Sequence, residues 1–85
     1  MTTHPIVTVY TTKTCAYCPS VKEFLRSKEV EFREVDVSDD VKPIKIPAKY
    51  SGAYTVPQTM FEHDDGTIVV IGPAWGRLMK EIARL

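Results

Sequence analysis

Apolar and polar residues recur along this chain with two periods, one typical of strands and one typical of helices. Residues 6–11 are β-branched and aromatic and too few for a helix, which predicts a largely buried strand. Residues 17–28 carry apolar side chains at helical spacing with charged residues between them, which predicts an amphipathic helix. The apolar positions of this helix are Tyr17, Val21, Phe24 and Leu25.

The next segment predicts a second strand and then a weaker helix. Residues 31–37 alternate charged and apolar side chains, as a strand does. A strand, a helix and a strand in this order predict a parallel pair with a right-handed crossover. Residues 38–52 begin with acidic side chains that suit a helix start, but Pro43 and Pro47 interrupt any long helix. We therefore expect a short or broken helix there.

The last third of the chain predicts a hairpin followed by a helix. Residues 58–63 and 67–71 are apolar runs around Asp64-Asp65-Gly66, whose Asp-Gly step favours a tight turn. Residues 75–85 form another amphipathic pattern. The apolar positions of this pattern are Trp75, Leu78, Met79, Ile82 and Leu85. The order of elements predicts one α/β domain over residues 1–85, with a four-stranded mixed sheet flanked by three helices.

Composition narrows the possible functions. The 85 residues include eleven basic and eleven acidic side chains, so a nucleic-acid binder or a polybasic membrane-surface protein is not expected. The longest aliphatic run, residues 68–71, is far shorter than the roughly 20 residues of a membrane-spanning helix. The first residues show no basic cluster before an apolar run, so we expect no targeting peptide and a cytoplasmic location.

The two cysteines, Cys15 and Cys18, lie at the junction between the first strand and the first helix. So short a disulfide loop stabilises a fold by at most about 2 kcal/mol, which is weak for a structural bridge. In a chain that is expected to be cytoplasmic, Cys-x-x-Cys after a strand and before a helix is typical of a redox motif. The helix N-terminus directs unpaired N–H groups at the first sulfur and stabilises its thiolate. We predict that Cys15 is the nucleophile and that Cys18, covered by the first helical turn, is the resolving thiol.

Two other interpretations of the cysteine pair remain open. Cys-x-x-Cys is also half of a zinc site, but the remaining candidate ligands, His4 and His63, are far apart and belong to no second ligand pair. We therefore favour a site without metal. Paired cysteines are also sometimes only small buried hydrophobic residues.

The sequence resembles the glutaredoxins, which are small oxidoreductases of the thioredoxin fold. Two motifs carry the resemblance. Cys15-Ala16-Tyr17-Cys18 follows a strand, with alanine where the family most often has proline. Thr55-Val56-Pro57 matches the family's Thr-Val-Pro signature, in which the proline peptide bond is cis and faces the cysteines. The resemblance implies a thioredoxin-like fold and a thiol–disulfide oxidoreductase.

The resemblance also implies a binding groove for glutathione or a peptide. In glutaredoxins the backbone at the position of Val56 aligns the cysteinyl unit of glutathione by strand addition. Lys13 lies one step closer to the first cysteine than the family's usual basic residue. Tyr54 and Trp75 are candidate groove residues, although core packing is favoured for Trp75. The candidate binding residues are Lys13, Tyr17, Tyr54, Thr55, Val56, Pro57, Ala74 and Trp75.

One departure from the family concerns the reductant. Glutaredoxins hold the γ-glutamyl end of glutathione with a Gly-Gly-x-Asp-Asp segment, whereas this chain has Gly72-Pro73-Ala74-Trp75-Gly76-Arg77 with no acidic side chain. Tight glutathione recognition is therefore not expected. Related redoxins that lack this site reduce ribonucleotide reductase and take electrons from thioredoxin reductase. Trp75-Gly76 resembles their tryptophan-containing segment only faintly.

The predicted activity is reduction of protein disulfides or glutathione mixed disulfides by a monomer without bound cofactor. Glutathione is the expected reductant or co-substrate, and thioredoxin reductase and ribonucleotide reductase are alternative partners. An iron–sulfur cluster module is the alternative from another class, which Cys18 and Tyr17 disfavour. Three lysines, Lys42, Lys45 and Lys49, indicate a basic face beside the groove, for which simple solvation is the favoured interpretation.

Overall fold

A computed structural model describes residues 5–85 of the chain and confirms the predicted order of elements. Strand β1 (Ile6–Thr11) is followed by helix α1 (Cys18–Ser27) and strand β2 (Arg33–Asp36). A short 3₁₀ helix, η1 (Lys42–Ile44), runs directly into α2 (Lys45–Ser51). The chain ends with the hairpin β3 (Gln58–His63) and β4 (Gly66–Ile71) and with helix α3 (Trp75–Ile82).

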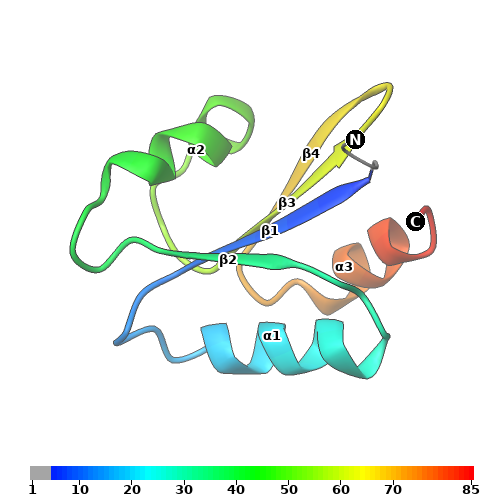
Figure 1. Ribbon diagram of the computed structural model, residues 1–85, viewed down its shortest axis with the longest axis horizontal. Coiled ribbons are helices and arrows are strands. Elements are labelled where there is room, and N and C mark those ends of the chain that lie inside the picture. Colours follow the sequence, from blue (N-terminus) through cyan, green and yellow to red (C-terminus); the bar gives the residue numbers. More distant parts are fainter. Residues whose placement is uncertain (1–4) are drawn as a thin grey trace.

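The four strands form one mixed sheet in the order β2-β1-β3-β4. Strands β1 and β2 are parallel, as the crossover through α1 requires, whereas β3 is antiparallel to both β1 and β4. Helices α1 and α3 cover one face of the sheet and α2 covers the other (Figure 1). His63 pairs with Gly66 across the predicted tight turn, so the hairpin is confirmed.

The central strand β1 is buried on both faces of the sheet, which explains why its residues do not alternate between apolar and charged types. On the α1 and α3 face, β1 and β3 contribute Val7, Val9 and Phe61 to a core completed by helix residues. On the α2 face, Tyr10 and Met60 pack with Val37, Ile44 and Val69. Alternation along each strand therefore sends successive side chains into two separate cores.

The broken helix before β3 is confirmed, and its local sequence explains its geometry. Pro47 is the third residue of α2, within the first turn, where a missing N–H breaks no intrahelical bond. Gly52 ends the helix in the left-handed conformation, with φ 73°, and its N–H donates to the carbonyl of Ala48 at 2.8 Å. The chain turns sharply after this cap and enters the loop that precedes β3.

Several boundaries and burials differ from the sequence predictions. Strand β2 covers less than residues 31–37, and α3 ends at Ile82. Tyr17 precedes the first turn of α1 and its residue surface is 58% exposed, so its assignment to the buried stripe is wrong. Met79 and Leu85 are also exposed. Met79 follows the buried Leu78 and so lies about 100° around α3 from it, and Leu85 lies beyond the last residue of the helix.

Candidate functional site

The two cysteines form a disulfide at the carboxyl end of β1. Their Cα atoms are 5.5 Å apart, within the range of disulfide geometry. Cys18 is the first residue of α1 and is 2% exposed, whereas Cys15 lies in the preceding loop and is partly exposed. Cys15 is therefore the cysteine that is more accessible to a partner.

The helix start directs a hydrogen-bond donor at the exposed cysteine. The backbone N–H of Cys18 donates to Sγ of Cys15 over 3.1 Å. Pro19, in the first turn, has no N–H to offer, and no acidic side chain lies in that turn. This N–H and the partial positive charge of the helix end favour a thiolate on Cys15 once the disulfide is reduced.

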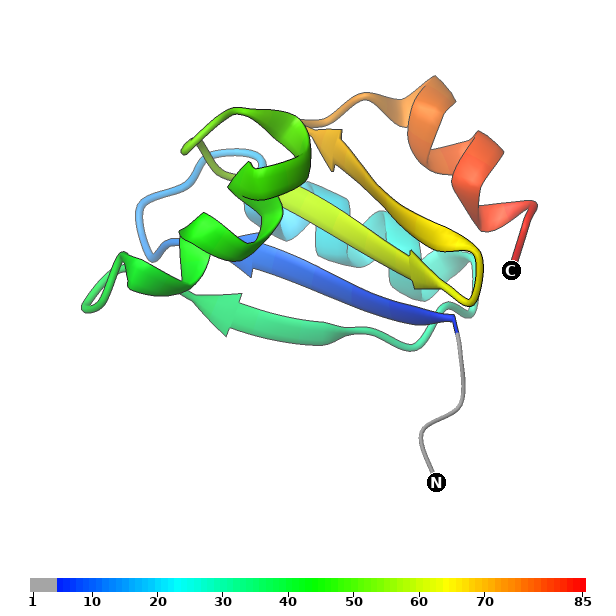
Figure 2. The ribbon, with the colours of Figure 1, turned by 90° about the horizontal axis from the view of Figure 1, so that it is seen from above.

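The loop before β3 lies at the same end of the sheet as the disulfide (Figure 2). Tyr10 of β1 pairs with Gln58 of β3, so the chain leaves β1 toward the cysteines next to where it enters β3 from Pro57. The peptide bond between Val56 and Pro57 is cis, as the family motif predicts. Pro57 is buried, Val56 is partly buried, and Thr55 is exposed. The predicted peptide-binding backbone is thus brought to the cysteine end of the sheet.

A buried glutamine that the sequence analysis did not single out holds this loop. Gln58 is 0% exposed and donates from Nε2 to the carbonyls of Ala53 at 2.9 Å and Thr55 at 2.8 Å. Its Oε1 accepts a hydrogen bond from the hydroxyl of Ser51 at 2.8 Å. Its position in the sequence could have identified it, because an amide side chain directly follows the motif proline at the start of a mostly buried strand.

The start of α3 is joined to the same loop. The N–H of Gly72 donates to the carbonyl of Pro57 at 2.8 Å. This bond holds the chain beside the cis-proline just before Ala74 and Trp75. Trp75 is 39% exposed, and its ring contacts Phe24 of α1 with the centroids 5.0 Å apart. Trp75 therefore packs against α1 on one side and meets solvent on the other, rather than being a core residue.

Lys13 is engaged with another loop. Its backbone N–H donates to Oγ of Ser38 at 2.7 Å, and its Nζ lies 3.1 Å from a carboxylate oxygen of Asp39. Both side chains of this ion pair are largely exposed, so the pair is weak and a substrate carboxylate competes with it easily. Ser38 also donates its backbone N–H to Asp36, and the Ser38 side chain and backbone lower the pKa of the Asp36 carboxyl.

A second polar cluster joins β1, α1 and β2 near the start of the cysteine loop. Glu34 of β2 accepts hydrogen bonds from the hydroxyl of Thr11 at 2.8 Å and from Nζ of Lys22 at 3.0 Å. The Lys22 ammonium, and then the Thr11 hydroxyl, lower the pKa of the Glu34 carboxyl. Because Thr11 is the last residue of β1, this cluster fixes the point from which the chain leaves the sheet toward Cys15.

Metal binding receives no support from the part of the chain that the structure describes. Within residues 5–85, no three His, Cys, Asp or Glu side chains come together as a metal site. His63, one of the two possible additional zinc ligands, lies at the far end of β3 beside Glu81, 3.6 Å from its carboxylate. His4, the other one, lies outside the described residues.

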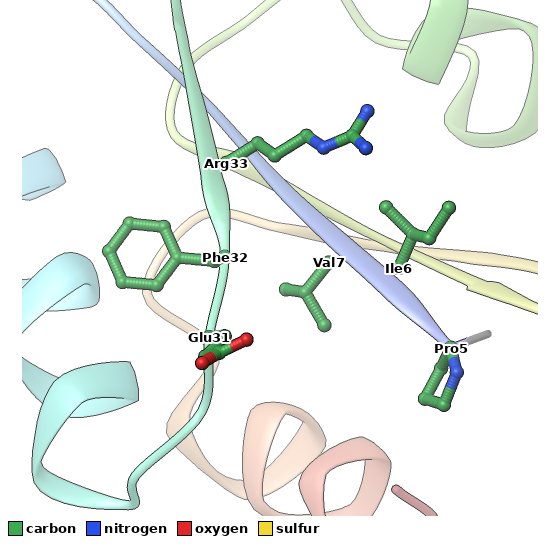
Figure 3. A pocket seen from close by; sticks show the side chains of 6 residues that line it. All are labelled: Pro5, Ile6, Val7, Glu31, Phe32 and Arg33. Atoms are coloured by element: carbon green, nitrogen blue, oxygen red, sulfur yellow. The ribbon is translucent and has the colours of Figure 1, made fainter. Parts of the chain in front are cut away.

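An open pocket lies between the start of β1 and the segment that enters β2 (Figure 3). It is lined by Pro5, Ile6, Val7, Glu31, Phe32 and Arg33. These residues belong to the start of β1 and to the segment entering β2, about 17 Å from the carboxyl end of β1. The pocket therefore takes no part in chemistry at the disulfide.

Among residues 5–85 no helix is long and apolar enough to cross a membrane.

A Cys-x-x-Cys pair at a helix start, at the same end of a four-stranded mixed sheet as a cis-proline loop, defines a dithiol protein of the thioredoxin fold. Comparison with solved structures agrees. The thioredoxin-like protein BC3987 superposes with a TM-score of 0.70 at 31% identity, over 87% of this chain and 96% of that one. Thioredoxin f from spinach chloroplast shares the fold at a TM-score of 0.63 and 22% identity, over 94% of this chain and 74% of that one.

Sequence comparison gives the family. The glutaredoxin family model matches residues 7–64. A glutaredoxin-like 8.6 kDa protein of the rubredoxin operon of Clostridium pasteurianum is 35% identical over 76% of this chain and 83% of its own length. Glutaredoxin 3 of Escherichia coli is 38% identical over 66% of this chain and 68% of its own length. The chain belongs to the glutaredoxin family and is a thiol–disulfide oxidoreductase.

Proposed function

We propose that this protein reduces disulfides of other proteins through both cysteines, with glutathione mixed disulfides as poorer substrates. The observation that carries the proposal is the difference between the two sulfurs. Cys15 is partly exposed and receives the N–H of Cys18, whereas Cys18 is buried beneath the start of α1. One thiol is therefore placed to meet a substrate and the other to meet only its neighbour.

The proposed reaction proceeds by two thiol–disulfide exchanges. The Cys15 thiolate attacks one sulfur of the substrate disulfide, that S–S bond breaks, and the departing substrate thiolate takes a proton. The Cys18 thiolate then attacks the Cys15 sulfur of the mixed disulfide and releases the second substrate thiol. The substrate gains two electrons and two protons, and the protein ends as the Cys15–Cys18 disulfide, the state in this structure. An external thiol or reductase restores the dithiol.

The start of α3 supports a limited role for glutathione. Its first turn contains no acidic side chain, and Arg77 is exposed there. A cationic ammonium group such as that of the γ-glutamyl unit therefore finds no carboxylate in that turn. We infer that the electrons come from a reductase of the thioredoxin reductase type at least as readily as from glutathione. Ribonucleotide reductase is one protein disulfide that belongs in the test.

The test follows NADPH consumption with two electron sources and two substrates. One source is glutathione with glutathione reductase, and the other is thioredoxin reductase alone. The substrates are insulin and the mixed disulfide of glutathione and 2-mercaptoethanol. We expect insulin reduction with thioredoxin reductase, and a high KM for the glutathione mixed disulfide. Failure of both sources to sustain turnover overturns the proposal, and so does tight, preferential use of the mixed disulfide.

A further inference from the structure

The outer side of α2 is an exposed surface that disulfide exchange itself does not use. Positions 45, 46, 49 and 50 lie on one side of this helix by helical spacing, and Pro47 and Ala48 are buried on the other. Two of the four outer residues are large and apolar, with Ile46 49% exposed and Tyr50 56% exposed. The other two are exposed lysines. We define the α2 face by these four residues, which are Lys45, Ile46, Lys49 and Tyr50.

The α2 face is positively charged in a chain whose net charge is zero. From residue 41 to residue 61 the chain contains three lysines and no aspartate or glutamate. Neither Lys45 nor Lys49 forms an ion pair within residues 5–85, whereas Lys13, Lys22 and Arg26 do. The acidic residue that precedes this run, Asp40, accepts the backbone N–H of Lys42. The cations of the face are therefore free to pair with charges outside the molecule.

The α2 face also lies close to the disulfide site along the chain. Tyr50 and Tyr54 are four residues apart, so their Cα atoms are at most about 14 Å from each other. Tyr54 is 69% exposed and belongs to the loop before the cis-proline. Figure 2 shows α2 toward the end of the sheet at which that loop and the cysteine loop also lie.

The size of a substrate decides whether it reaches both places. A standard protein interface covers about 800 Å² on each partner, or about 28 Å across. This span is comparable with the two shorter dimensions of the molecule, which are 24 Å each. A protein bound with its disulfide at Cys15 is therefore large enough to reach the α2 face, whereas a tripeptide is much smaller than this span.

We propose that the α2 face docks acidic protein substrates. Carboxylates of the substrate pair with Lys45 and Lys49, and an apolar side chain between them packs on Ile46 and Tyr50. This inference rests on the proposed function, because it names the class of protein whose disulfide is reduced. Charge complementarity supplies a faster encounter and the apolar contact slows dissociation.

Single-turnover kinetics test the proposal without assuming a reductant. Pre-reduced protein is mixed, without oxygen, with one of two synthetic peptides that share an intramolecular disulfide and flanking leucines. One peptide carries four glutamates and the other four lysines. We expect the acidic peptide to be reduced at least tenfold faster at low salt, with most of the difference lost at high salt. Lys45→Glu/Lys49→Glu should abolish or reverse this preference.

The matched control is Lys28→Glu/Lys80→Glu, which changes the net charge equally but lies on other surfaces. It should keep most of the preference for the acidic peptide. If the two double variants behave alike, or if wild-type protein reduces both peptides at one rate, the α2 face is not a docking surface, although the oxidoreductase proposal stands.

A binding experiment separates the two proposals. Cys15→Ser/Cys18→Ser protein performs no exchange, so amide chemical-shift changes with the acidic peptide report binding alone. Shifts over residues 45–50 support docking even if no peptide is reduced, which would overturn only the proposed function. Shifts absent from residues 45–50, or equal for both peptides, refute the docking surface.

Discussion

The side-chain amide of Gln58 donates a 2.8 Å hydrogen bond to the carbonyl of Thr55, so the first residue of β3 fixes the loop that precedes it. A second bond to Ala53 and one accepted from Ser51 complete the set. Because Gln58 is fully buried, an apolar replacement fills the same space and offers these three groups no hydrogen-bond partner.

We predict that Gln58→Met weakens both the fold and substrate binding. Methionine keeps the volume but makes none of the three hydrogen bonds, which should lower the free energy of unfolding by about 1–3 kcal/mol. With the Thr55 backbone no longer held, KM for a protein disulfide should rise more than kcat falls. Urea unfolding and steady-state kinetics measure the two effects.

Thr59→Val is the matched control for this prediction. Thr59 is the next residue of β3, is also fully buried, and its hydroxyl has no hydrogen-bond partner in the described part of the chain. Its replacement should leave stability and KM unchanged or slightly improved. Equal effects of the two substitutions would show that Gln58 acts only as a core residue.

The sequence predicted the elements well because their signals are local. The position of the cysteines between β1 and α1 follows from one strand pattern and one helix pattern, and the buried Cys18 follows from its place in the first turn. The cis bond at Pro57 came from the family motif. These features depend on a few neighbouring residues.

What the sequence did not show depends on contacts between distant segments. The bond from Gly72 to Pro57 and the bonds of Glu34 to Thr11 and Lys22 join residues that periodicity treats separately. The exposure of Tyr17 depends on which residue begins α1, a boundary that apolar spacing does not fix.

We predict that Cys18→Ser separates the two substrate classes. Exchange with a glutathione mixed disulfide needs one nucleophilic thiol, whereas reduction of a protein disulfide needs a second thiol to resolve the mixed disulfide. The variant should therefore keep glutathione-dependent reduction of the mixed disulfide and lose insulin reduction. Mass spectrometry should detect the variant covalently bound to its protein substrate. Loss of both activities would contradict the roles assigned to Cys15 and Cys18.

We predict a pH-dependent contribution from Glu34. Lys22 and Thr11 lower its folded-state pKa, so the stabilisation is present above the unfolded-state pKa and disappears as pH falls through the folded value. Since this carboxylate is partly exposed, Glu34→Gln should cost only about 0.5 kcal/mol at pH 7, and less under acidic conditions below pH 4. Denaturant unfolding at the two pH values measures it. Glu31→Gln, at an exposed residue outside this cluster, is the control for the loss of one surface carboxylate.

Gly76→Asp tests why glutathione is expected to bind weakly. Gly76 is the second residue of α3, is exposed, and has open space where a Cβ would lie, so aspartate fits without a clash. A carboxylate in the first turn should stabilise the helix by about 0.3–1 kcal/mol. The same carboxylate can pair with the ammonium group of the γ-glutamyl unit, so kcat/KM for the glutathione mixed disulfide should rise several-fold while insulin reduction changes little.

Gly76→Asn supplies the shape without the charge and should leave glutathione use unchanged. If both variants raise kcat/KM equally, charge at this turn does not limit glutathione binding, and the weak site must be explained by Pro73 or Trp75 instead.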